Sequence, residues 1–205
     1  MSHKLLKTIQ GVNVYQDEDK RIHYVADMSV DVDGAHHSYR LDNKRPPALD
    51  DIHASAGYPN GSWHNVLVRD PRDSSKPYVD SEGFCVSMTS YYREDFPYTD
   101  RKRWIDAETV PYMVLPGSIR KACRGIALGC KARMTRTTDG LIVDGVYADS
   151  SGSNIGEASV AAAKIYGDQW NAGNGDERKI YQYEFWPDTI AVVCGETFRL
   201  IPYGE

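Results

Sequence analysis

Short runs of β-branched and aromatic residues, separated by polar turn residues, fill most of this chain and predict strands. The runs lie at residues 12–15, 21–26, 28–32, 63–69, 84–91, 110–115, 179–185 and 197–201. Stretches rich in Pro, Gly, Ser and Asp at 42–62 and 70–82 predict long surface loops between them.

Two local patterns are more specific than the rest. The segment Gly125 to Asp149 predicts a β-hairpin, because Asp139-Gly140 supplies the positive φ that a tight turn needs. One helix is predicted from about Gly156 to Tyr166, where the Ala-rich run has high helix propensity. A polar loop at 168–178 follows it. We therefore expect one mainly β domain over residues 1–205, an antiparallel β-barrel with one central helix and long loops on one rim.

Composition narrows the class of partner. The chain has 205 residues, enough for one substantial domain, and a net charge of −5. This charge argues against a nucleic-acid partner and favours a neutral or cationic one. Tyr is frequent, with 14 Tyr against 4 Phe, which suits strand surfaces and also suits sugar rings.

Two acidic residues flank a loop of small residues. Asp149 ends the predicted hairpin, and Glu157 begins the predicted helix. Such a loop lets a polymer approach closely, and glycoside hydrolysis uses a pair of carboxyl groups on the two sides of the scissile bond. An acidic residue near a helix start also serves as a cap or a dipole partner, so spacing alone leaves both interpretations open.

The segment Ile155-Gly-Glu157-Ala-Ser159, preceded by Asp149, resembles the signature of the fungal-type chitosanases, glycoside hydrolase family 75. Further segments similar to that family follow the same order along the chain: 28–34, 86–90, 110–117, 184–187 and 197–198. The resemblance covers most of residues 21–202. The chain departs from the family pattern at Ser150-Ser151-Gly152, where Gly-Pro is usual, at Ser29, which replaces an Asp, and in a shorter interval between the two acids.

The resemblance implies an endo-acting, inverting hydrolase of β-1,4-linked glucosamine polymers such as chitosan, without a cofactor. It places the family's essential Asp on Asp149 and its essential Glu on Glu157. A helix N-terminus would favour ionised Glu157 as the base, and burial would favour protonated Asp149 as the acid. The reverse assignment stays open. A double-psi barrel is one form of the expected fold, by analogy with other hydrolases of structural glycans.

Candidate substrate contacts come from acidic and aromatic residues. Asp31 and Asp33 alternate onto one face of a strand, where they would bind glucosamine ammonium groups or simply face solvent. Tyr24, Tyr112 and Tyr147 are candidate sugar contacts, with core packing as the alternative. We expect no bound metal; the alternative is a metal site at His36-His37 beside Asp33.

Two other functions stay open: a peptidoglycan-type cell-wall hydrolase, as in a phage lysin or an injected toxin, and a non-catalytic glycan-binding domain. The presence of both Asp149 and Glu157 argues against the latter. The N-terminus lacks the apolar core of a secretory signal, and no apolar run is long enough to cross a membrane. We therefore expect a monomer made in the cytoplasm that reaches an extracellular polysaccharide by another route, or a trimmed secreted chain. The spacing of the four cysteines matches no zinc or CxxC pattern, and their redox state stays open.

Overall fold

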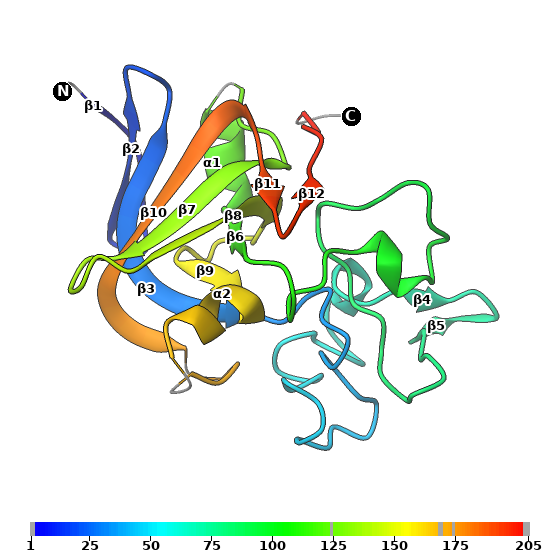
Figure 1. The fold of residues 1–205 in the computed structure, drawn as a ribbon. Coiled ribbons are helices and arrows are strands. Elements are labelled where there is room, and N and C mark those ends of the chain that lie inside the picture. The colour runs from blue at the N-terminus through cyan, green and yellow to red at the C-terminus, as the bar shows by residue number, and fades with distance from the viewer. Residues whose placement is uncertain (1–2, 124, 168–169, 174, 203–205) are drawn as a thin grey trace.

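Six strands close into a β-barrel in the computed structural model, which describes residues 3–123, 125–167, 170–173 and 175–202 (Figure 1). Around the barrel they are β3 (Ile22–Asp31), β10 (Asp176–Ile190), β7 (Cys130–Arg136), β8 (Ile142–Asp149), β6 (Tyr112–Val114) and β9 (Glu157–Ser159), and β9 pairs back onto β3. The β3–β9 and β6–β8 pairs are parallel, and the other four are antiparallel. The predicted mainly β barrel is confirmed, with mixed strand directions.

Short elements decorate this barrel. The hairpin of β1 (His3–Ile9) and β2 (Val12–Asp17) extends the sheet beyond β3. The small pairs are β4 (Arg69–Asp70) with β5 (Asp73–Pro77) and β11 (Val192–Val193) with β12 (Glu196–Thr197). The helices of the described residues are α1 (Gly117–Ala122), α2 (Val160–Ile165) and the 3-10 turns η1 (Trp63–Asn65) and η2 (Arg101–Arg103). None of the helices in the described part of the chain is long and apolar enough to span a membrane.

The predicted helix at 156–166 is shorter than expected, because its first residues form a strand. Gly156 has φ +87°, and a Cβ there would lie 2.6 Å from an Asp27 carboxylate oxygen, so this glycine permits close contact with β3. The chain then runs beside β3 as β9. The helix begins only after Ser159, whose hydroxyl accepts a hydrogen bond from Ala162 N as an N-cap. Glu157 therefore lies in a strand rather than at a helix N-terminus.

Large aromatic residues fill the barrel interior. Alternate residues of β3 point inward, and Tyr24 stacks on Tyr183 of β10 with ring centroids 5.0 Å apart. Phe185 of β10 packs beside them, fully buried. The opposite face of β3 ends at Asp31, so the interior is apolar while the outward face supplies acidic groups.

Residues 32–111 form long loops at one side of the barrel (Figure 1). The predicted strands at 63–69 and 84–91 are wrong. The first contains a 3-10 turn, and the second makes only isolated bridges at Cys85 and Ser87. Most of their apolar residues are buried nevertheless, and Leu67 and Cys85 belong to the main core. Hydrophobic contacts thus pack the loops against the barrel and hold their exposed residues in defined positions.

Two other expectations can be compared with the structure. The hairpin of β7 and β8 is confirmed, and Gly140 in its turn has φ +74°. Residues 168, 169 and 174 of the predicted loop at 168–178 lie outside the described residues. Cys85 and Cys130 are buried thiols and Cys194 is an exposed thiol, while buried Cys123 accepts a hydrogen bond from Gln16 Nε2 at 3.1 Å.

Candidate active site

The strand pairing brings Asp149 and Glu157 to one face of the barrel. Asp149 ends β8 and Glu157 begins β9, and both pair with Val114 of the intervening β6. Since neighbouring strands lie about 4.8 Å apart, the two α-carbons are about 10 Å apart. Both side chains line the same cavity, of about 690 Å³. The two carboxyl groups therefore reach this cavity from strands on either side of β6.

Asp149 is held by three hydrogen-bond donors on one carboxylate oxygen. Oδ1 accepts from Ser90 N at 3.0 Å, Ser90 Oγ at 2.6 Å and Ser150 N at 2.6 Å. Burial raises the pKa of Asp149, and these donors, with a hydrogen bond from Asp31, oppose that rise by stabilising the ionised form.

Glu157 has a different environment. Burial and, to a smaller extent, the negative charge of Asp149 raise the pKa of Glu157 to about 7. No hydrogen bond among the described residues offsets this rise. The pKa of Glu157 therefore lies close to neutral pH.

Asp31, at the end of β3, and Asp33, just after it, lie beside this pair. Asp31 Oδ1 accepts from Asp33 N at 2.8 Å, and Tyr39 donates to Asp33 Oδ1 at 3.1 Å. Carboxylate oxygens of Asp31, Asp33 and Asp149 all lie within 4.8 Å of one another. Burial raises the pKa of Asp31 and of Asp33 well above the ordinary value, and the neighbouring acidic charges raise both further.

These four acids concentrate negative charge in one cleft. Among the described residues, none of the ion pairs involves Asp31, Asp33, Asp149 or Glu157. Such a set of oxygens accepts protons, an ammonium group or a hard divalent cation.

An aromatic wall forms another part of the same cavity. Tyr92, Tyr98 and Trp104 line it, and Tyr98 is 44% exposed. The Arg103 guanidinium lies over the Tyr92 ring, 4.6 Å from its centroid, and it also lines the cavity. The cleft thus combines flat aromatic surfaces, acidic groups and one arginine, which are the groups that bind sugar rings bearing charged substituents.

The three tyrosines predicted as sugar contacts lie elsewhere, and this expectation is wrong. Tyr24, Tyr112 and Tyr147 are at most 1% exposed and do not line the cavity. Their positions are structural: Tyr112 donates to the Asp33 carbonyl at 2.9 Å, and the Tyr147 hydroxyl lies 2.7 Å from Ser150 Oγ. Tyr112 and Tyr147 thus hold Asp33 and Ser150, two residues that line the cavity, through hydrogen bonds.

The sequence pattern did not indicate the residues that surround these acids. Ser90 lies in the 86–90 segment of the family resemblance, but nothing in that segment indicated a contact with Asp149. Tyr92, Tyr98 and Trp104 follow it in a polar stretch without strand periodicity. Only the burial of this loop against the barrel brings them to the cleft.

Comparison with known proteins leaves the family resemblance a prediction. No protein-family model matches the chain, and no curated protein matches it either.

Proposed function

We propose that this protein is an endo-acting glycoside hydrolase of β-1,4-linked amino-sugar polymers, with chitosan as its substrate and inversion at the anomeric carbon. The observation that carries the proposal is the convergence of Asp149, Glu157, Asp31 and Asp33 on one open cavity with an aromatic wall.

Glu157 is the general acid in this mechanism. Burial and the Asp149 charge raise the pKa of Glu157 to about 7, so a substantial fraction of its carboxyl groups carries a proton at neutral pH and can donate it to the leaving glycosidic oxygen. This assignment reverses the roles that a helix N-terminus at Glu157 would give, since Glu157 lies in β9.

Asp149 is the general base. The hydrogen bonds from Ser90 and Ser150 stabilise its carboxylate and fix its orientation. It takes a proton from a water molecule that attacks the anomeric carbon from the face opposite to the leaving group. The intervening Val114, which also lines the cavity, separates the two carboxyl groups and leaves room for that water.

Asp31 and Asp33 recognise the substrate. An ammonium group of glucosamine is a cation of the size and charge that their clustered oxygens accept. Tyr98, which is 44% exposed, provides a ring surface on which a pyranose can stack.

The test is the release of reducing ends, together with viscosity loss, from soluble chitosan by the wild type, Asp149→Asn and Glu157→Gln. We expect both variants to fold and to lose activity by a factor of 10³ or more. Asp144→Asn is the matched control, because Asp144 lies on the same strand β8 but pairs with Arg133 and is more than half exposed. NMR of the first product should show inverted anomeric configuration.

Activity on chitosan that survives both substitutions would refute the site. Inactivity of the folded wild type on every amino-sugar polymer would instead favour a glycan-binding domain.

A peptidoglycan-type hydrolase is the second candidate, and Arg103 favours it. A purely cationic polymer is repelled by this arginine, whereas the lactyl or peptide carboxylates of peptidoglycan would pair with it. Cleavage of peptidoglycan that falls in Arg103→Gln, with unchanged or faster chitosan cleavage, would move the substrate to the bacterial cell wall.

A further inference from the structure

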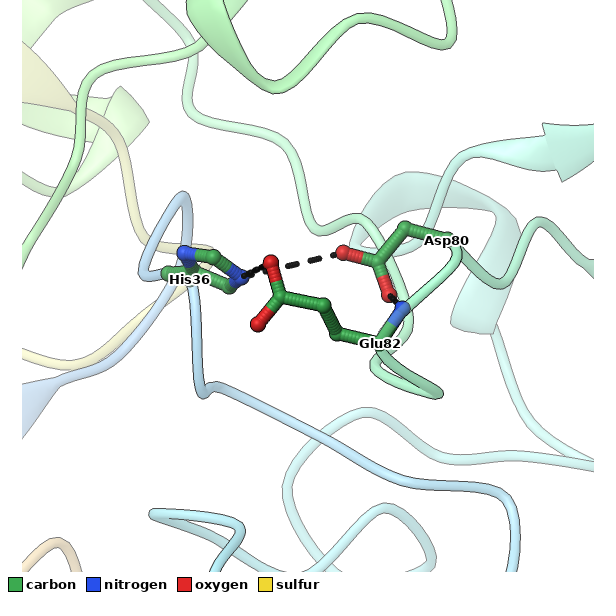
Figure 2. A group of neighbouring side chains, drawn as sticks. All are labelled: His36, Asp80 and Glu82. Atoms are coloured by element: carbon green, nitrogen blue, oxygen red, sulfur yellow. Dashed lines mark hydrogen bonds and ion pairs between the residues drawn. The ribbon is translucent and has the colours of Figure 1, made fainter.

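A histidine and two carboxylates from different segments meet outside the cleft. His36 lies in the loop after β3, and Asp80 and Glu82 lie in the turn between β5 and Cys85 (Figure 2). The His36 Nε2 atom is 3.3 Å from Glu82 Oε1 and 3.8 Å from Asp80 Oδ2. The ligand atoms of the three residues all lie within 4.8 Å of one another.

The His36 ring is held in place by its neighbours. It stacks on His37 with ring centroids 4.7 Å apart and meets the edge of Phe84 at 6.0 Å. His37 is itself fixed by Glu108, whose Oε2 is 2.9 Å from His37 Nδ1. The His36 side chain is 35% exposed, but its Nε2 atom is shielded from solvent; it has no hydrogen-bond partner among the described residues and points at the two carboxylates (Figure 2). A buried ring nitrogen without a hydrogen bond calls for a ligand.

The two carboxylates differ in how firmly they are held. Asp80 Oδ1 accepts from the backbone N–H groups of Glu82 and Phe84, and Oδ2 accepts from Arg101 Nε at 2.7 Å. Burial opposes ionisation, but the bonds from Phe84 N and Arg101 outweigh it and lower the pKa of Asp80. A ligating carboxylate with such hydrogen-bonded support is typical of metal sites. Glu82 is 60% exposed and free to adjust toward an ion.

We propose that His36, Asp80 and Glu82 bind one Zn²⁺ ion, with water completing the coordination. The spacing supports zinc: ligand atoms at 2.0–2.2 Å from a tetrahedral ion lie about 3.3–3.6 Å from each other. The measured separations from His36 Nε2 are 3.3 Å and 3.8 Å. One imidazole with two carboxylates suits zinc, whereas calcium and magnesium prefer oxygen donors alone.

The ion would link two segments beside the cleft. Arg101 already joins them, because it donates to Asp80 and to the carbonyl oxygens of Ala35 and Phe84. The His36 loop directly follows Asp31 and Asp33, so zinc would stabilise the segment that carries these acids. This is a structural role, and it stands whether or not the proposed hydrolase activity is found.

The experiment measures zinc binding by calorimetry and by thermal unfolding, with ZnCl₂ as the probe. All proteins carry Cys194→Ser, because this exposed thiol would otherwise be a competing ligand. We expect one zinc per chain and a rise in Tm of about 5 °C at a hundredfold excess over Kd. MgCl₂ and CaCl₂ should give no such rise.

Two variants and one control test the ligands. His36→Gln and Glu82→Gln should each weaken zinc binding at least tenfold, and Glu82→Gln leaves the fold intact because Glu82 is exposed. His64→Gln is the matched control, since His64 is an exposed histidine of η1 outside the cluster, and it should bind zinc like the parent. Absence of zinc binding, or tight binding that survives both ligand substitutions, would overturn the proposal and leave His36, Asp80 and Glu82 as a structural cluster without a metal.

Discussion

The hydrogen bond from Ser90 Oγ to Asp149 offers a sharp test of the proposed roles. It is 2.6 Å long and is the largest of the contributions that lower the pKa of Asp149 against the effect of burial. Ser90→Ala removes this donor and leaves the backbone N–H donors of Ser90 and Ser150 in place. The change therefore raises the pKa of Asp149 without removing the base.

The size of the effect follows from the charge on the acceptor. A hydrogen bond to an ionised group contributes about 1.5–3 kcal/mol. We take the lower end because two donors remain, and about 1.4 kcal/mol corresponds to a factor of ten. The base works only when ionised, so kcat/KM should fall about tenfold on the acidic limb of the pH profile. On the plateau, where Asp149 is ionised in both proteins, the ratio should approach one.

The assay is the pH profile of kcat/KM on soluble chitosan for the wild type, Ser90→Ala and Ser150→Ala. Ser150→Ala is the matched control, because its hydroxyl contacts Tyr147 and only its backbone N–H reaches Asp149. Its acidic limb should not move. A Ser90→Ala profile that moves on the alkaline limb alone would show that Asp149 is the acid and would refute the assignment. Equal shifts in both serine variants would refute the argument from this hydrogen bond.

Three further predictions address stability and binding. Glu157→Gln should stabilise the fold by up to about 3 kcal/mol at pH 8 and have little effect at pH 4, as measured by denaturant unfolding. The pKa of Glu157 is about 7 in the folded protein and 4.5 ordinarily, so the buried ionised carboxylate lowers the stability of the wild type as pH rises through this window. Gly34→Ala should destabilise the fold by about 3 kcal/mol or more, because the new Cβ would lie 2.0 Å from the Ile105 carbonyl oxygen. Gly140→Ala is the control: its Cβ meets no atom within 4 Å, and the substitution should cost only about 1–2 kcal/mol for the positive φ. Equal losses of stability in chemical denaturation would contradict the clash. Tyr98→Ala should raise KM about fivefold with kcat nearly unchanged, for a stacking contribution of about 1 kcal/mol, while Tyr98→Phe retains the wild-type KM; a loss in kcat alone would contradict a binding role.

Local patterns predicted the parts of the fold that depend on local chemistry. The β7–β8 hairpin follows from Asp139-Gly140, because few residues other than glycine adopt φ +74° without strain. Alternation identified β3 and placed Asp31 near Asp33. The small-residue loop after Asp149 correctly indicated that Asp149 and Glu157 share one space.

The errors arise where the decisive contacts are long-range. Alternation shows that Tyr24 and its neighbours in β3 face opposite sides, but it does not show which side is the barrel interior. The residues before α2 have high helix propensity, yet pairing of Glu157–Ser159 with both β3 and β6 outweighs it. Trp104 reaches the cleft only through burial of a loop that has no periodicity.

The buried acids of the cleft affect both the stability of the fold and the binding of the proposed substrate. Burial beside other acids raises the pKa of Asp31 and of Asp33 well above the ordinary value, so the empty cleft favours their protonated forms. A glucosamine ammonium group that enters the cluster supplies the positive charge that those protons supplied. Substrate binding must then release protons and lower the pKa values of Asp31 and Asp33. Under the proposed function, the acids whose ionised forms are destabilised by burial in the empty cleft are the same groups that bind the cationic sugar.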